Sequence, residues 1–230
     1  MDLDSYVISP AERPSLAVRG DTRRFPIRRI LCVGRNYAAH AREMGSDPDR
    51  EPPFFFSKPA DAITSAATVP YPSLTSSFHH EVELVVAIAT GGRDLDPSTA
   101  LEHVYGYGVG IDLTRRDLQE AAKSTGRPWD FAKGFDLSAP CSDLVPVAQC
   151  GHPAAGAIWL SVNDARKQSG DLADMIWSVP EVIAAASRAI ELAPGDLIYT
   201  GTPSGVGPLV RGDRVECSIA GVGELRITIA

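Results

Sequence analysis

Short apolar runs, separated by segments that contain Gly and Pro, dominate the chain. Runs with period-two alternation or Val and Ile enrichment predict strands at 28–34, 81–89, 104–111, 157–162, 197–200, 214–219 and 224–229. Helical spacing is limited to 36–44, a short piece that opens at Asp96-Pro97, 114–124 and 178–192. The pattern predicts an α+β, mainly β fold. Because neither an internal repeat nor a low-complexity linker is visible, we expect residues 1–230 to form a single domain.

Two segments are expected to lie outside the regular core. Residues 1–27 are mixed in character and contain Pro10 and Pro14, so we expect a peripheral N-terminal segment. Residues 36–53 combine the predicted helix, with Asn36 as a candidate N-cap, and a polar, Pro-rich stretch from Gly45 to Pro53. Such a loop next to a helix can fold over a site, and we therefore predict that 36–53 is a lid.

Composition narrows the classes of partner. Apolar residues at 44% and charged residues at 22% exclude wholesale disorder, and the net charge of −7 argues against nucleic acid or an anionic membrane as a partner. No apolar stretch approaches the roughly 18 residues of a membrane span. The start of the chain lacks a signal-peptide pattern, and the four cysteines are scattered without a C-x-x-C pair. We therefore expect a cytoplasmic protein.

The strongest chemical signal is a pair of carboxylates in an apolar strand. Side chains two apart on a strand face the same side, so Glu81 and Glu83 project together. Their mutual repulsion and burial would be relieved by a hard divalent cation, whereas two acids on a solvated strand edge would need no ion. His79 and His80 do not complete an iron site, because neighbouring residues on a strand point in opposite directions.

Asp112 adds a third carboxylate at the end of the next strand. Taken alone, it also fits the N-cap of the predicted 114–124 helix. Together with Glu81 and Glu83, it would form a facial set of ligands that leaves metal positions open for water or substrate. The three acids therefore favour a metal site.

His40 and Glu43 lie three residues apart in the predicted lid helix, which places them on one helix face. A carboxylate that orients an imidazole makes it a stronger base, as general-base catalysis requires. The other interpretation is an ordinary surface His–Glu pair, which would contribute only a few tenths of a kcal/mol.

Basic residues cluster on and after the 114–124 helix, although the chain as a whole is acidic. They are Arg115, Arg116, Arg127 and Lys133, with Gln119 between them. Cations beside three carboxylates suit an anionic substrate, while a solvated helix face would explain each of them separately. The turn from Gly201 to Gly207 lacks the ending of a Walker loop, and we expect it to present Thr202 to a small acid.

Together these segments resemble the fumarylacetoacetate hydrolase family. The matching motifs, in family order, are Gly34-Arg35-Asn36-Tyr37 with His40 and Glu43, Phe56-Ser57-Lys58-Pro59, Glu81-Val82-Glu83-Leu84, the stretch 110–119, Lys133, Pro194-Gly195-Asp196 and the stretch 201–207. The resemblance covers the chain from about Arg28 to its end. The short N-terminus points to the acylpyruvate hydrolase branch, and the stretch 45–56 resembles the bacterial fumarylpyruvate hydrolases of gentisate breakdown.

The resemblance implies a mixed β-sandwich roll, a bound Mg²⁺ or Mn²⁺ and a homodimer. It assigns the metal to Glu81, Glu83 and Asp112, and catalysis to His40 and Glu43 on the lid with Lys133 next to the metal. It also implies that Arg35, Arg116, Gln119 and Thr202 bind substrate, the last three at its pyruvoyl end.

The implied reaction is hydrolysis of a carbon–carbon bond in a 2,4-dioxo acid, with fumarylpyruvate giving fumarate and pyruvate. Two alternatives stay open at this point. Oxaloacetate decarboxylation or keto–enol tautomerisation would use the same metal-held enolate without attack by water. A non-catalytic protein that binds dicarboxylates would keep the fold without the reaction.

Overall fold

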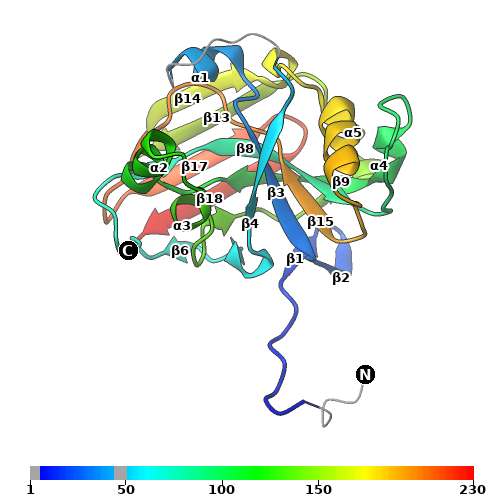
Figure 1. Ribbon diagram of the computed structural model, residues 1–230, viewed down its shortest axis with the longest axis horizontal. Coiled ribbons are helices and arrows are strands. Elements are labelled where there is room, and N and C mark those ends of the chain that lie inside the picture. Colours follow the sequence, from blue (N-terminus) through cyan, green and yellow to red (C-terminus); the bar gives the residue numbers. More distant parts are fainter. Residues whose placement is uncertain (1–5, 44–50) are drawn as a thin grey trace.

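The computed structural model describes residues 6–43 and 51–230 (Figure 1). Strands predominate over helices, which confirms the predicted α+β, mainly β class. The central sheet has six strands, in the order β12 (Val145–Pro146), β9 (Val104–Ile111), β8 (Val82–Ile88), β15 (Asp196–Tyr199), β3 (Arg29–Gly34) and β4 (Phe54–Lys58). It is mixed, because β15 runs parallel to β3 and antiparallel to β8.

A five-stranded sheet lies against the central one. Its order is β14 (Ala165–Asp171), β13 (Ala157–Val162), β17 (Arg214–Ile219), β18 (Gly223–Ile229) and β6 (Thr68–Val69). Strands β13 and β14 form a hairpin, whose turn has positive φ angles at Asn163 and Asp164. Leu84 and Val86 of β8 share one buried cluster with Leu160 and Ile227 of this sheet. The two sheets therefore enclose the main core, as in a sandwich.

Short elements complete the fold. The remaining strands are β1 (Ser15–Val18), β2 (Asp21–Pro26), β5 (Ile63–Thr64), β7 (Phe78–His80), β10 (Thr114–Arg115), β11 (Ala139–Pro140) and β16 (Gly207–Pro208). The α-helices are α1 (Ala38–Glu43), α2 (Arg116–Ser124), α3 (Asp130–Lys133), α4 (Val147–Cys150) and α5 (Val179–Ala189). Three 3₁₀ turns are η2 (Ala60–Ala62), η3 (Ala100–His103) and η4 (Leu172–Asp174). No helix among the described residues is long and apolar enough to cross a membrane.

Most predicted elements lie close to their expected positions, and the differences have local causes. The α5 helix opens with the capping box between Ser178 and Glu181. The helix predicted from Thr114 begins two residues later, because Thr114 and Arg115 pair with β7. After Asp96-Pro97 only a 3₁₀ turn forms.

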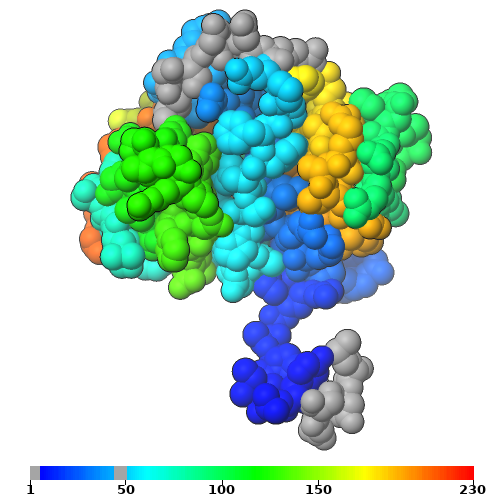
Figure 2. Space-filling model, viewed as in Figure 1, coloured from blue at the N-terminus to red at the C-terminus, as the bar shows by residue number. Residues whose placement is uncertain are grey.

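The N-terminal segment has two parts. Residues 6–14 extend away from the body of the molecule (Figure 2). The β1–β2 hairpin, in contrast, covers the outer face of the central sheet. There Leu16 is fully buried in a second apolar cluster, which includes Ile30, Val85 and Leu197. Both faces of β8 therefore pack against apolar side chains, and every residue of this strand is buried.

Candidate active site

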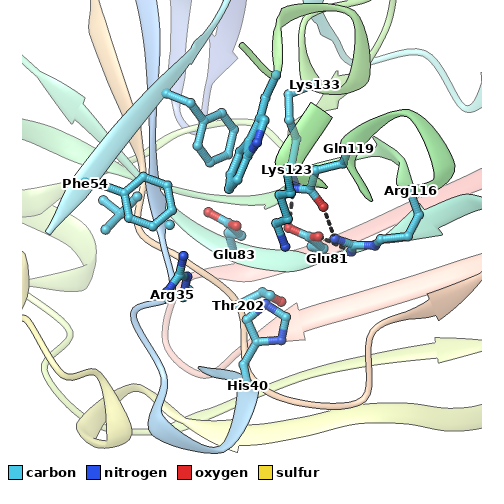
Figure 3. A pocket seen from close by; sticks show the side chains of 14 residues that line it. Arg35, His40, Phe54, Glu81, Glu83, Arg116, Gln119, Lys123, Lys133 and Thr202 are labelled. Atoms are coloured by element: carbon cyan, nitrogen blue, oxygen red, sulfur yellow. Dashed lines mark hydrogen bonds and ion pairs between the residues drawn. The ribbon is translucent and has the colours of Figure 1, made fainter. Parts of the chain in front are cut away.

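A pocket opens at the end of the central sheet, between α1, α2, α3 and the loop 201–207 (Figure 3). Eight predicted site residues line it: Arg35, His40, Glu81, Glu83, Arg116, Gln119, Lys133 and Thr202. Glu43 lies behind His40, and Asp112 lies in contact with Lys133. The fold therefore brings together the ten residues to which the resemblance assigned catalysis, substrate binding or the metal.

The three acids meet because their strands are neighbours. The backbone N–H of Asp112 donates a hydrogen bond to the carbonyl of Glu81 at 2.8 Å, and Glu83 pairs with Gly110 of β9. Carboxylate oxygens of the three residues lie within 4.8 Å of one another, and all three side chains are buried. The solvated-edge interpretation is therefore wrong, because β8 is an interior strand. Asp112 is not an N-cap either, since α2 begins only at Arg116.

Three cations, Lys133, Arg116 and Lys58, lie next to this acidic triad. The Lys133 amine donates to Glu81 at 2.9 Å and to Asp112 at 2.7 Å, and the Arg116 guanidinium donates to Glu81. Burial opposes ionisation of Glu81, but Lys133 and Arg116 outweigh it and hold the pKa of that carboxyl well below its usual value. The predicted cationic neighbourhood thus exists, although Arg115 and Arg127 are not among the residues that line the pocket.

Glu83 is in a different electrostatic position. Among the described residues it makes no ion pair, and its Oε2 accepts only the Gly201 N–H, at 2.8 Å. Burial, followed by the charges of Asp112 and Glu81, raises the pKa of the Glu83 carboxyl well above its usual value. One buried carboxylate therefore lacks a compensating positive charge.

These residues fit a divalent metal ion. Oδ1 of Asp112 has no hydrogen-bond partner, and its nearest cation, Lys58 at 2.8 Å, lies outside hydrogen-bonding geometry. Buried carboxylate oxygens without donors are the ligands that hard cations such as Mg²⁺ and Mn²⁺ prefer. The triad therefore offers a divalent cation both open oxygen atoms and uncompensated negative charge.

The helix α1 places His40 at the pocket wall. Nδ1 of His40 lies 3.2 Å from Oε2 of Glu43, and the His40 side chain is almost completely buried. Burial lowers the pKa of His40, although the carboxylates of Glu81 and Glu43 act in the opposite direction. When Nδ1–H donates to Glu43, the free lone pair is on Nε2. The pair is thus not an ordinary exposed surface contact.

The glycine loop 201–207 connects the two halves of the site. Gly201 donates to Glu83, Gly205 donates to Glu43, and Thr202 lines the pocket between them. Thr202 is held in place because its hydroxyl accepts a hydrogen bond from the Gln168 amide at 2.7 Å. Gly205 has a φ of +92°, which favours glycine.

Sequence reasoning missed several residues that line the pocket or lie next to it. Lys58 was part of a recognised motif but received no role, although its amine contacts Asp112. Lys123 follows Arg116 by seven residues, a spacing that puts both on one face of α2 and could have indicated its position. Phe54 and Phe56 alternate on β4 and contact the ring of Trp129 with centroid distances of 5.5 and 5.6 Å.

Two histidines have structural roles, as expected. His80 lies 3.0 Å from the Gln168 amide oxygen, and His79 lies 3.1 Å from the Ser77 hydroxyl. Neither belongs to the group of metal-ligating atoms that the described residues form.

Comparisons with known proteins agree with this geometry. The family described as fumarylacetoacetate (FAA) hydrolase C-terminal matches residues 29–230. The crystal structure of fumarylpyruvate hydrolase from Pseudomonas aeruginosa in complex with Mn²⁺ and pyruvate is 50% identical, with a TM-score of 0.96 over 98% of this chain and 99% of that one. Fumarylpyruvate hydrolase from Ralstonia sp. is 45% identical over 81% of this chain and 98% of its own length. The mitochondrial oxaloacetate tautomerase FAHD1 of Arabidopsis thaliana is 40% identical over 87% of this chain and 90% of its own. The chain belongs to the fumarylacetoacetate hydrolase family.

Proposed function

We propose that this protein hydrolyses a carbon–carbon bond in a 2,4-dioxo acid, and that fumarylpyruvate, cleaved to fumarate and pyruvate, is its substrate. The observation that carries the proposal is a buried acidic triad that shares one pocket with the His40–Glu43 pair. Metal ligands and a positioned base are together what hydrolytic cleavage requires. The fumarylpyruvate hydrolases at 45% and 50% identity support this substrate.

In this proposal Glu81, Glu83 and Asp112 hold Mg²⁺ or Mn²⁺. A divalent ion there would supply Lewis-acid stabilisation to the enolate charge that develops on the pyruvate half. The Mn²⁺ and pyruvate in the Pseudomonas structure support such a site. Lys133, which donates to both Glu81 and Asp112, fixes the two carboxylates and places its own positive charge beside the reacting atoms.

Substrate binding follows from the polar groups around the triad. Arg116 donates to both Glu81 and Gln119, so that its guanidinium and the Gln119 amide face the pocket together. With Thr202 they provide a cation, an amide and a hydroxyl for the pyruvoyl carboxylate and 2-oxo group. Arg35, at the other side of the pocket, completes the binding residues.

His40 then acts as the general base. Nε2 removes a proton from water as the oxygen attacks the C4 carbonyl, and Glu43 keeps the required tautomer by accepting the Nδ1–H. The C3–C4 bond breaks with its electron pair on the pyruvate half. Return of the proton to C3 gives pyruvate, while C4 leaves as the new carboxylate of fumarate.

Oxaloacetate tautomerisation or decarboxylation is the second candidate, supported by the Arabidopsis tautomerase. Both reactions require stabilisation of an enolate but no nucleophilic water. The hydrogen-bonded His40–Glu43 pair favours hydrolysis over them, and it also disfavours a non-catalytic binding role.

We also propose that the protein is a cytoplasmic homodimer. A reducing compartment agrees with four cysteines that form no disulfide. The apolar side chains of Val7 and Ile8, which are largely exposed in the single chain, support association with another copy.

Purified protein assayed with Mg²⁺ against fumarylpyruvate, acetylpyruvate and oxaloacetate tests the function. We expect fumarylpyruvate to give equimolar fumarate and pyruvate, with turnover lost in chelator and restored by added Mg²⁺ or Mn²⁺. Turnover of oxaloacetate alone would overturn the hydrolase assignment.

A further inference from the structure

The mouth of the pocket carries Lys123, to which the proposed reaction gives no role, and Arg35, to which it gives only a general role in substrate binding. Arg35, at the end of β3, and Lys123, on α2, reach into the pocket from different sides (Figure 3). Both side chains are exposed, whereas the triad below them is buried. The pocket thus has a buried end at the acidic triad and a solvent-accessible end at Arg35 and Lys123.

Charge balance separates these two cations from the others. Arg116, Lys133 and Lys58 each lie within ion-pair distance of Glu81 or Asp112, so these three cations already have carboxylate partners. Within the described residues, neither Arg35 nor Lys123 has a carboxylate at ion-pair distance. Partial desolvation of its amine in the pocket mouth, followed by the charges of Arg116 and Arg35, lowers the pKa of Lys123, although much of the side chain is exposed.

Aromatic rings hold both cations in place. The guanidinium carbon of Arg35 lies 5.2 Å from the Phe54 ring centroid, and the Lys123 amine lies 5.4 Å from that of Trp129. Phe54 and Trp129 themselves meet edge to face at 5.5 Å. The two rings are therefore nearly perpendicular and form an aromatic corner, with one cation beside each ring and unsaturated substrate groups able to pack on the exposed ring faces.

The distance between Arg116 and Lys123 along α2 indicates how long a ligand that contacts both residues must be. Lys123 follows Arg116 by seven residues, which at 1.5 Å per residue corresponds to about 10 Å along the helix axis. A seven-carbon chain with a carboxylate at each end has a comparable reach. A chain held at Arg116 by one carboxylate can therefore present the other near Lys123.

We propose that Arg35 and Lys123 form a subsite for a second, distal carboxylate, so that this protein selects dianionic acylpyruvates whose acyl group is planar and ends in a carboxylate. The inference rests on the proposed function and extends it. An acyl group without that carboxylate, such as acetyl, leaves both cations without a partner.

The test compares fumarylpyruvate with acetylpyruvate in Lys123→Met, Arg35→Gln and the conservative Lys123→Arg. Lys167→Met, at an exposed lysine outside the pocket, is the matched control. Loss of one charge-assisted contact should raise KM for fumarylpyruvate about 10- to 100-fold with little change in kcat. KM for acetylpyruvate should stay within about twofold, Lys123→Arg should restore most of the selectivity, and Lys167→Met should match the wild type.

The outcomes separate the two levels of the account. A wild-type protein that cleaves neither acylpyruvate refutes the proposed function, and with it this subsite. A wild-type protein that cleaves fumarylpyruvate, with variants that lose both substrates equally or neither, refutes the subsite alone.

Discussion

Both carboxylate oxygens of Glu43 lie 3.1 Å from the backbone nitrogen of Gly205. The acid that orients His40 is therefore anchored to the loop that carries Thr202 and that donates to Glu83 through Gly201. A Cβ atom at position 205 would lie 2.1 Å from the Lys167 carbonyl oxygen, so this loop can approach closely only with glycine there. The loop 201–207 thus helps to position the proposed base His40, the proposed substrate-binding residue Thr202 and the proposed metal ligand Glu83.

The pH dependence of catalysis should reflect the environment of His40. Burial lowers its pKa from the usual 6.5, so the neutral imidazole that acts as a base persists to lower pH. We expect the acidic limb of the kcat/KM profile, measured at saturating Mg²⁺, to have its midpoint below 6.5. A midpoint well above that value would show that another group controls the base.

Glu43→Gln should shift this limb further toward acid. Glu43 raises the pKa of His40 through its hydrogen bond and its charge, so removal of that charge lowers the pKa and weakens the base. We expect kcat to fall by about tenfold, less than for removal of the imidazole itself. A profile that keeps its midpoint would indicate that Glu43 acts only by anchoring Gly205.

Two metal-ligand substitutions should separate metal binding from stability. Glu83→Gln removes a carboxylate that has no ion pair among the described residues, whereas Asp112→Asn takes the carboxylate partner from the buried Lys58 and one of two carboxylate partners from the buried Lys133. Both variants should lose Mg²⁺ binding and at least about 10²-fold in turnover. Only Asp112→Asn should lose about 3–5 kcal/mol of unfolding free energy in chelator.

Metal titration calorimetry and urea unfolding of both proteins measure these quantities. Equal destabilisation by the two substitutions would contradict the charge balance described for the triad.

Asn36→Ala should destabilise the fold where β3 leads into α1. The Asn36 amide donates to the carbonyls of Trp177 and Thr200 at 2.9 and 2.8 Å, and its oxygen accepts the Trp177 N–H at 2.7 Å. Its removal takes a hydrogen bond from the buried Thr200 carbonyl, at a cost of about 1–3 kcal/mol, and two more from the part-buried backbone of Trp177. Urea unfolding should show this loss, while Gln149→Ala, at an exposed amide bonded to the Arg19 carbonyl, should change little. An unchanged midpoint for Asn36→Ala would contradict this role.

The local sequence pattern was sufficient to predict most strands and the three carboxylates of the triad. The strand 104–111 was predicted with its exact bounds because its apolar and glycine positions alternate, and period two alone places Glu81 and Glu83 on one side. Asn36 shows where local reasoning stops. It was expected to cap the lid helix, but its side chain bonds to residues more than 140 positions away. Such contacts depend on how distant strands and loops are arranged in the fold, as does the contact between Lys58 on β4 and Asp112.

The stretch 45–50, predicted as part of the lid, lies outside the described residues. The helix that precedes it does form, as α1. Lys123 was overlooked for a different reason. An exposed lysine on a polar helix has an ordinary sequence context, and its seven-residue spacing from Arg116 becomes informative only beside Phe54 and Trp129.

The most direct test of the central claim compares wild type and His40→Ala in three measurements: fumarylpyruvate hydrolysis, oxaloacetate decarboxylation and oxalate affinity. If His40 activates water beside the acidic triad, hydrolysis should fall by about 10²–10⁴-fold. Oxalate affinity, which depends on the metal end of the pocket, should change little, and any decarboxylation should survive better than hydrolysis. Equal loss of both activities together with loss of oxalate binding would show that His40 shapes the site and is not its base.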